Sequence, residues 1–128
     1  MSEIEKIIED AWKNKEDINQ NSEATIIDSI NQIIEDLDAG KIRVAEKINN
    51  EWVTHQFIKK AIMLSFRIHE MEALSGPYSS WYDKAHLLKG KTSNWKKTDF
   101  EVAGFRMVPN SPVRRGSYIG KNVVLMPC

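Results

Sequence analysis

The sequence predicts an α+β protein in which a mostly helical N-terminal domain with a small hairpin leads into the first coil of a parallel β-helix. Two apolar stripes at helical spacing come first, and a turn signal at Asn49-Asn50 separates two short strand patterns. Near the other end Val113, Ile119 and Leu125 recur every six residues. A six-residue period is typical of a parallel β-helix, in which each repeat contributes one strand and one bend.

Two helices are predicted from the apolar stripes. The first stripe consists of Ile4, Ile7, Ile8, Ala11 and Trp12, and the second of Ile26, Ile27, Ile30, Ile33, Ile34 and Leu37. Ser2 with Glu5 forms the signature of a capping box at the start of the first helix. Gly40 is well placed to end the second helix. Both stripes are interpreted as surfaces that pack in a core.

A hairpin and a third helix are predicted next. Ile42, Val44 and Ala45 indicate a strand, Asn49-Asn50 a left-handed turn, and Trp52-Val53 the return strand. Thr54 is the predicted N-cap of a helix whose broad apolar surface comprises Phe57, Ile58, Ala61, Ile62, Leu64, Ser65 and Ile68.

The helical and strand patterns weaken between Met71 and Asp99. Gly76-Pro77 indicates a turn, and Leu87–Lys97 is predicted to be an exposed basic loop. Thr98 is expected to cap a short helical turn that Gly104 ends. Lysines mixed with tryptophan also suit a nucleic-acid surface, but acidic and basic residues balance at 18 each and no binding motif is present. No nucleic-acid partner is therefore expected.

The six-residue pattern comprises the repeats Val113–Tyr118 and Ile119–Val124 and the beginning of a third at Leu125. A solenoid buries its core by stacking coils, so the chain is expected to stop as its solenoid begins. The predicted division is therefore a helical domain over residues 1–103 and a truncated β-helix over residues 104–128. A pair of ordinary strands with aliphatic residues six apart by chance remains the alternative.

Composition limits the class of protein. The apolar fraction of 41% suits a soluble globular chain, and no apolar run reaches the length of a membrane span. The acidic N-terminus does not resemble a signal peptide, and the single cysteine, Cys128, fits a reducing compartment. A cytoplasmic protein without a membrane partner is expected. His55 has no second histidine or carboxylate at metal spacing, so no metal site is predicted.

Three blocks together resemble the N-terminal part of the tetrahydrodipicolinate N-succinyltransferase family of hexapeptide-repeat acyltransferases. They are Ile42–Ile68, the WYDK at Trp81–Lys84, and GFRMVPNSPVRRGSYIGKNVVLMPC at Gly104–Cys128. The resemblance implies a helical N-terminal domain, a left-handed parallel β-helix and a C-terminal cap. It also implies a homotrimer with active sites between neighbouring β-helices.

The resemblance implies transfer of a succinyl group from succinyl-CoA to the amino group of ring-opened tetrahydrodipicolinate, in lysine and diaminopimelate biosynthesis. Succinyl-CoA is then a cosubstrate, and no cofactor is tightly bound. Arg106, in GFRMVP, lies where the family places an arginine that contacts the dicarboxylate substrate. Arg114, Arg115 and Lys84 have no assigned role. The family's acid/base and coenzyme A residues are expected beyond Cys128, so this chain alone is expected to be inactive.

Two other interpretations remain open at the level of the sequence. The amphipathic helices and the incomplete repeat suit a stand-alone interaction module, and a nonfunctional gene fragment would have the same sequence. Whether the reading frame continues past Cys128 distinguishes these possibilities from the enzyme.

Overall fold

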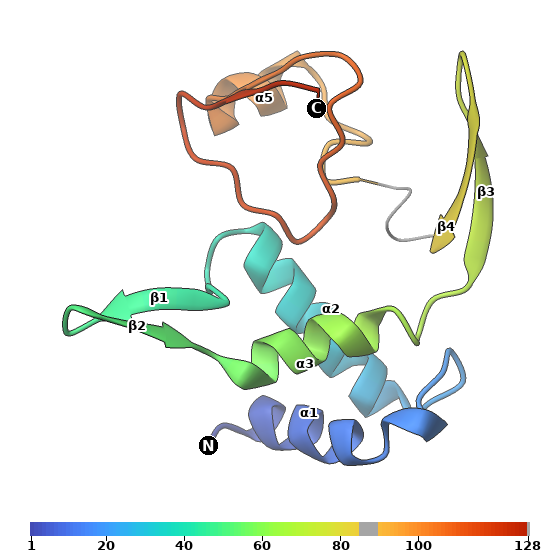
Figure 1. Ribbon diagram of the computed structural model, residues 1–128, viewed down its shortest axis with the longest axis vertical. Helices are drawn as coiled ribbons and strands as arrows, with labels where there is room; N and C mark the ends of the chain where they lie inside the picture. Colours follow the sequence, from blue (N-terminus) through green and yellow to red (C-terminus); the bar gives the residue numbers. More distant parts are fainter. Residues whose placement is uncertain (85–89, 128) are drawn as a thin grey trace.

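The computed structural model describes residues 1–84 and 90–127. Three helices pack together at the end of the molecule that carries the N-terminus, and the C-terminal segment forms the opposite end (Figure 1). These helices are α1 (Glu3–Lys13), α2 (Ala24–Asp38) and α3 (Gln56–Ser65). A short 3-10 helix, η1 (Lys15–Asp17), follows α1, and α5 (Lys97–Ala103) lies beside the C-terminal segment.

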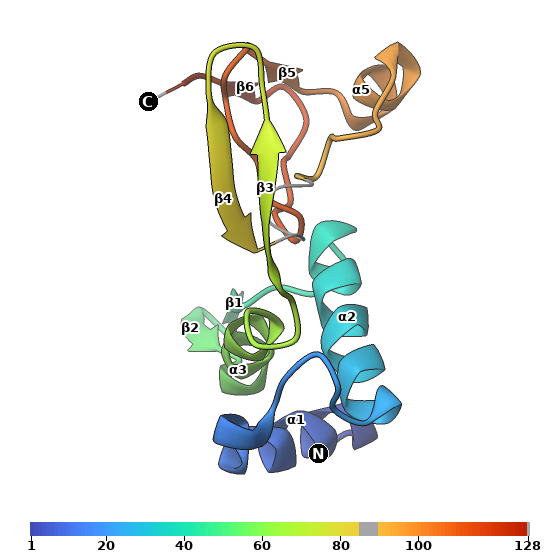
Figure 2. The same cartoon turned by 90° about the vertical axis from the view of Figure 1, so that its right-hand side faces the viewer.

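The described strands form three two-stranded sheets. β1 (Ala45–Ile48) pairs antiparallel with β2 (Glu51–Thr54), and β3 (Met71–Ser75) pairs antiparallel with β4 (Ser80–Lys84). β5 (Arg106–Met107) pairs with β6 (Val124–Leu125), and this pair is parallel. The β1–β2 hairpin projects from the helices, whereas β3–β4 stands beside the C-terminal segment (Figures 1 and 2). The α+β class predicted from the sequence is confirmed.

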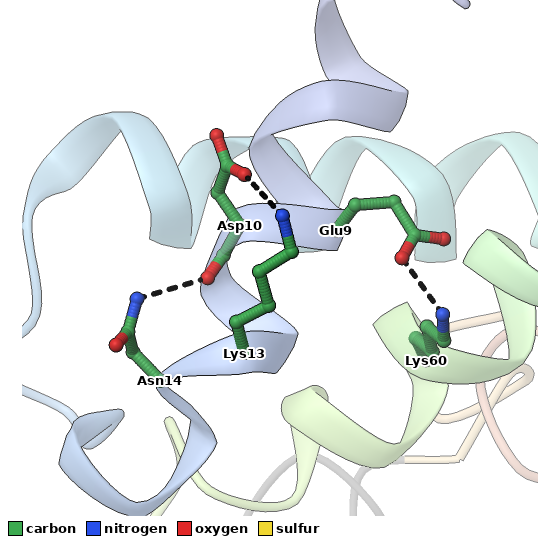
Figure 3. A network of polar contacts seen from close by, with 5 residues as sticks. All are labelled: Glu9, Asp10, Lys13, Asn14 and Lys60. Carbon is green, nitrogen blue, oxygen red and sulfur yellow. Dashed lines mark hydrogen bonds and ion pairs between the residues drawn. The ribbon is translucent and has the colours of Figure 1, made fainter.

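The apolar stripes form the core, as predicted. The buried cluster joins the three helices and consists of Ile8, Ala11, Ile18, Ile30, Ile33, Ile34, Leu37, Ile58, Ala61, Leu64 and Ile68. At the edge of this core, Glu9 of α1 and Lys60 of α3 form an ion pair of 2.7 Å, while Asp10, Lys13 and Asn14 interact within the end of α1 (Figure 3). The polar contacts therefore border an interface that apolar burial holds together.

The predicted helix ends are confirmed where glycine or serine sets them. The Ser2 hydroxyl accepts a hydrogen bond from the Glu5 N–H at 3.3 Å. Gly40 follows α2 with φ of 74°, a left-handed conformation that costs glycine little. η1 was not predicted, because it lies in a stretch without apolar periodicity.

Two threonines predicted to cap helices do not do so. Thr54 pairs with Ala45 at the end of β2, and His55 is the residue before α3. Thr98 lies inside α5. The first turn of α5 is instead closed by Asp99, because its carboxylate accepts the Lys96 N–H at 2.7 Å. In both places a competing interaction, strand pairing or a nearby carboxylate, sets the boundary.

The first hairpin was predicted with its turn correct and with a first strand that begins too early. Asn49 and Asn50 both have positive φ, 49° and 69°, as a two-residue hairpin turn of this kind requires. Of the three residues predicted for the first strand, Ala45 is the first residue of β1. Ile42 and Val44 lie before β1 and pack against the helical core.

The β3–β4 hairpin was missed, although its turn was predicted. The Gly76 N–H donates to the Ser79 carbonyl at 2.8 Å, which closes the turn between the two strands. The aromatic pair Trp81-Tyr82 in β4 was a local signal for a strand. The two strands are largely exposed, and their sequences show no clean alternation of apolar and polar residues.

The prediction of an exposed basic loop at Leu87–Lys97 is wrong for its most informative residues; residues 87–89 lie outside the described part. The Lys91 side chain is 7% exposed and paired with Asp38. Trp95 packs against Phe100 and Phe105, with ring centroids 5.1 and 5.6 Å apart. The partner of Lys91 lies 53 residues away, a distance over which a local pattern gives no signal. The Trp95 ring is covered by two aromatic rings that follow it in the chain.

The core assignment predicts a large difference between two neighbouring residues of α3. Leu64 is 0% exposed and Met63 is 54% exposed. Leu64→Ala should lower the free energy of unfolding by about 2–5 kcal/mol, because it deletes buried methyl groups and leaves a cavity. Met63→Ala, the matched control, should change it by about 0.5 kcal/mol or less. Urea unfolding of both variants measures this, and equal losses would contradict the assignment.

Candidate functional site

The parallel pair β5–β6 carries the residue that the sequence selected as a site. The Arg106 N–H donates to the Val123 carbonyl at 2.9 Å, and the Val108 N–H donates to the Leu125 carbonyl at 3.0 Å. Arg106 lies opposite Val124 and Met107 opposite Leu125, so each partner is eighteen residues further along the chain. Eighteen residues equal three of the six-residue repeats found in the sequence.

Arg106 lies on the exposed side of β5. Phe105 is 6% exposed and Met107 is partly buried, whereas Arg106 is exposed, as the alternation of an extended strand predicts. An open groove of about 550 Å³ runs past it, and the other charged residues of its wall are Lys97 and Glu101 of α5. Within residues 1–84 and 90–127 no carboxylate forms an ion pair with Arg106. The exposed Arg106 side chain is thus part of the wall of this groove.

The other cations singled out by the sequence lie elsewhere and have protein partners. Arg114 Nη2 is 3.7 Å from Asp83 Oδ2, and Arg115 Nη2 is 3.1 Å from Glu35 Oε1. Lys84 Nζ donates to a backbone carbonyl, that of residue 69, at 3.0 Å. Arg114 lines a separate cleft of about 400 Å³ between β4 and the C-terminal segment. The structure thus separates these three cations from the groove of Arg106.

His69 lies close to two of these cations. Its pKa is lowered from the ordinary value of 6.5 by burial first, and then by the charges of Arg115 and Lys84. All three effects disfavour the imidazolium, since burial removes water from the charge and the neighbours repel it. The neutral form of His69 is therefore favoured in the folded protein.

Neither a metal cluster nor a membrane span is found in the described part of the chain. There, no group of three or more histidine, cysteine, aspartate or glutamate side chains is placed to hold a metal ion. His55 is instead hydrogen-bonded to Glu46, with Nε2 2.7 Å from Oε1. No described helix is both long and apolar enough to cross a bilayer. Cys128 lies outside the described residues.

Asp38 and Lys91 join the helices to the C-terminal segment, and neither was predicted as an important residue. Lys91 Nζ is 3.1 Å from Asp38 Oδ1, and the Gly116 N–H donates to the same oxygen at 2.8 Å. Residues so far apart in sequence leave no periodic or motif signal. The only local signal nearby was Gly40, which was predicted to end α2 and follows Asp38 by two residues.

Taken together, these features describe an α+β domain whose C-terminal strand pair is parallel and follows a six-residue period. The family described as "Tetrahydrodipicolinate N-succinyltransferase N-terminal" matches residues 3–68, which is more than half of the chain. The chain belongs to this family, which confirms the resemblance drawn from the sequence.

Curated relatives extend the similarity to the last residues. The chain is 68% identical over 128 residues to a 2,3,4,5-tetrahydropyridine-2,6-dicarboxylate N-succinyltransferase of Pelagibacter ubique, covering 100% of this chain and 46% of that protein. Proteins of the same name from Actinobacillus succinogenes and Nitrosomonas europaea are 47% and 45% identical, each over 99% of this chain and 46% of the relative. The chain thus spans about half the length of the curated relatives it matches, as their N-terminal portion.

The lowered pKa of His69 predicts a pH dependence of stability. The unfolded chain binds a proton at this residue near pH 6.5, whereas the folded protein binds it only at lower pH. The stability that neutral His69 contributes is thus fully present above pH 6.5 and is lost as pH falls through the folded pKa. Thermal melts between pH 7.5 and 5 should therefore fall more steeply for the wild type than for His69→Gln. Parallel curves would contradict the assignment.

Proposed function

We propose that this chain forms the N-terminal part of an enzyme that transfers a succinyl group from succinyl-CoA to the amino group of tetrahydrodipicolinate, in lysine and diaminopimelate biosynthesis. Family membership and the names of the curated relatives support the reaction. The observation that carries the proposal is the placement of Arg106, exposed beside a groove on the parallel strand pair.

We further propose that residues 104–128 are the start of a left-handed parallel β-helix and that residues 1–103 form a separate helical domain. Met107 extends the six-residue register of Val113, Ile119 and Leu125 back by one repeat. All four are partly covered, and Met107 lies beside Leu125, as expected if one coil takes three repeats. Tyr118 and Val124, which precede two of these positions, are exposed.

Arg106 is proposed to bind one carboxylate of the substrate. A planar guanidinium offers two parallel N–H donors to a carboxylate, which the single ammonium of lysine does not reproduce. The side chain is exposed and its charge is not neutralised by a described carboxylate, so its donors are available to an anion. Glu101 in the same groove disfavours a second negative group on that side.

The proposed reaction requires the substrate amine to attack the thioester carbonyl of succinyl-CoA. A C–N bond forms, the C–S bond breaks, the amine loses a proton and coenzyme A leaves as the thiol. A general base and oxyanion donors are needed, and no described residue is assigned to either role. No tightly bound cofactor is needed, because succinyl-CoA supplies the acyl group. A cytoplasmic homotrimer is the expected assembly.

Restoring the remaining length of a relative tests this function. A chimera would join residues 1–128 to the C-terminal 54% or so of the Pelagibacter ubique protein, of which this chain covers 46%. We expect the chimera to release coenzyme A from succinyl-CoA only when tetrahydrodipicolinate is present. Residues 1–128 alone should give no release, because the acid/base and coenzyme A residues are expected beyond Cys128. A well-folded chimera without turnover would contradict the proposed function.

Arg106→Lys in the chimera tests the site. Loss of a charge-assisted hydrogen bond costs about 1.5–3 kcal/mol, so kcat/KM for tetrahydrodipicolinate should fall by about ten- to a hundredfold or more. KM for succinyl-CoA and the melting temperature should change little. Arg67→Lys, a conservative change in an exposed pair with Glu16 at 3.6 Å, is the matched control. Equal effects on both substrates with a lower melting temperature would make Arg106 structural.

A further inference from the structure

The last turn of α2 is joined to two distant segments through one carboxylate. Asp38 Oδ1 accepts the Gly116 N–H at 2.8 Å and lies 3.1 Å from Lys91 Nζ. Lys91 Nζ also donates to the Asp38 backbone carbonyl at 2.6 Å. One residue at the end of the helix therefore contacts both the segment that precedes α5 and the turn that precedes β6.

Lys91 depends strongly on its ion pair with Asp38, because the lysine side chain is buried. Its side chain is 7% exposed, whereas that of Asp38 is 28% exposed. A buried ammonium that loses its carboxylate partner is left without compensation, which costs more than the pair itself contributes. Lys91 also interacts with the negative end of α2 by donating to the carbonyl of its last residue. Loss of Asp38 should therefore displace the segment that carries Lys91.

The turn at residues 114–118 has further contacts with the same end of α2. Gly116 has φ of 100°, so its N–H reaches Asp38 from a backbone conformation that favours glycine. The Tyr118 ring lies over Gly40, where an added Cβ would come within 2.5 Å of the ring, and Arg43 lies 4.5 Å from the ring centroid. The position of this turn is thus fixed relative to the helices.

A backbone hydrogen bond links the segment that carries Lys91 to the chain that leads into β6. The Lys91 N–H donates to the Val113 carbonyl at 2.9 Å, and an added Cβ on Gly90 would meet the same oxygen at 2.5 Å. The segment held by Lys91 is therefore in close contact with the first of the six-residue repeats. From that repeat the chain continues directly to β6, which pairs with the strand of Arg106.

We propose that Asp38 and Lys91 form a charged clamp that positions the β5–β6 pair, and with it Arg106, relative to the helical bundle. Asp38 is a positioning residue, since it acts on Arg106 only through the turn at 114–118 and the repeats that follow. The consequence for substrate binding rests on the proposed function. The clamp itself is a property of this chain and is tested without turnover.

Amide hydrogen exchange on this chain tests the clamp. In Asp38→Ala, the Arg106 and Val108 amides, which donate across the strand pair, should exchange about ten- to a hundredfold faster, because local opening becomes easier. The amide of Leu64 in the core should keep its rate. Asp36→Ala is the matched control, because it removes from the same turn of α2 a carboxylate that accepts a hydrogen bond from the Gln32 side chain. The backbone carbonyl of Asp36, which accepts the Lys41 N–H, is kept.

A double variant separates positioning from general stability and remains informative if Asp38→Ala does not fold. Asp38→Asn keeps an acceptor for Gly116 but leaves Lys91 uncompensated, so it should also accelerate exchange at Arg106 and Val108. Asp38→Asn combined with Lys91→Met removes the orphaned charge and should restore most of the protection. Unchanged exchange at Arg106 and Val108, an equal acceleration at Leu64, or a double variant no better protected than Asp38→Asn would each overturn the proposal. None of these results depends on the Arg106→Lys kinetics.

Discussion

The end of α2 is the constraint on which the arrangement of this molecule depends. The helix packs with α1 and α3 through its isoleucine stripe, so its position is fixed by the apolar core. Its last turn presents carbonyl groups and a partial negative charge, which favour a cation and N–H donors nearby. Lys91 and Gly116 meet this requirement at Asp38. The apolar core thereby fixes the position of the turn that carries Gly116.

The strand pair that follows is small but has a definite geometry. Two hydrogen bonds across β5–β6 place Arg106 opposite Val124, eighteen residues further along the chain. Because strand side chains alternate, Met107 faces inward with the six-residue series while Arg106 faces the groove beside α5. The same register that organises the repeat thus exposes the arginine proposed to bind the substrate. Arg114 and Arg115, in contrast, are joined to Asp83 and Glu35.

Patterns that act over a few residues could be predicted from the sequence, and those that depend on distant partners could not. The isoleucine stripes, the Asn49-Asn50 turn and the helix end at Gly40 are local, and each was predicted correctly. The family was predicted from three blocks in the right order and is confirmed. Thr54 was misplaced because strand pairing set the boundary of α3. Lys91 was predicted to be exposed because its partner Asp38 lies 53 residues away. Arg106 as a substrate residue stays a prediction.

The central proposal is that residues 104–127 follow a coil of three six-residue repeats, which would account for the pairing of Arg106 with Val124. Solution nuclear magnetic resonance of the chain tests it directly, through nuclear Overhauser contacts between β5 and β6. We expect contacts from the Arg106 amide proton to the protons of Val123 and Val124, and from the Val108 amide proton to those of Leu125. Contacts to residues one repeat earlier, or none between these segments, would contradict the claim.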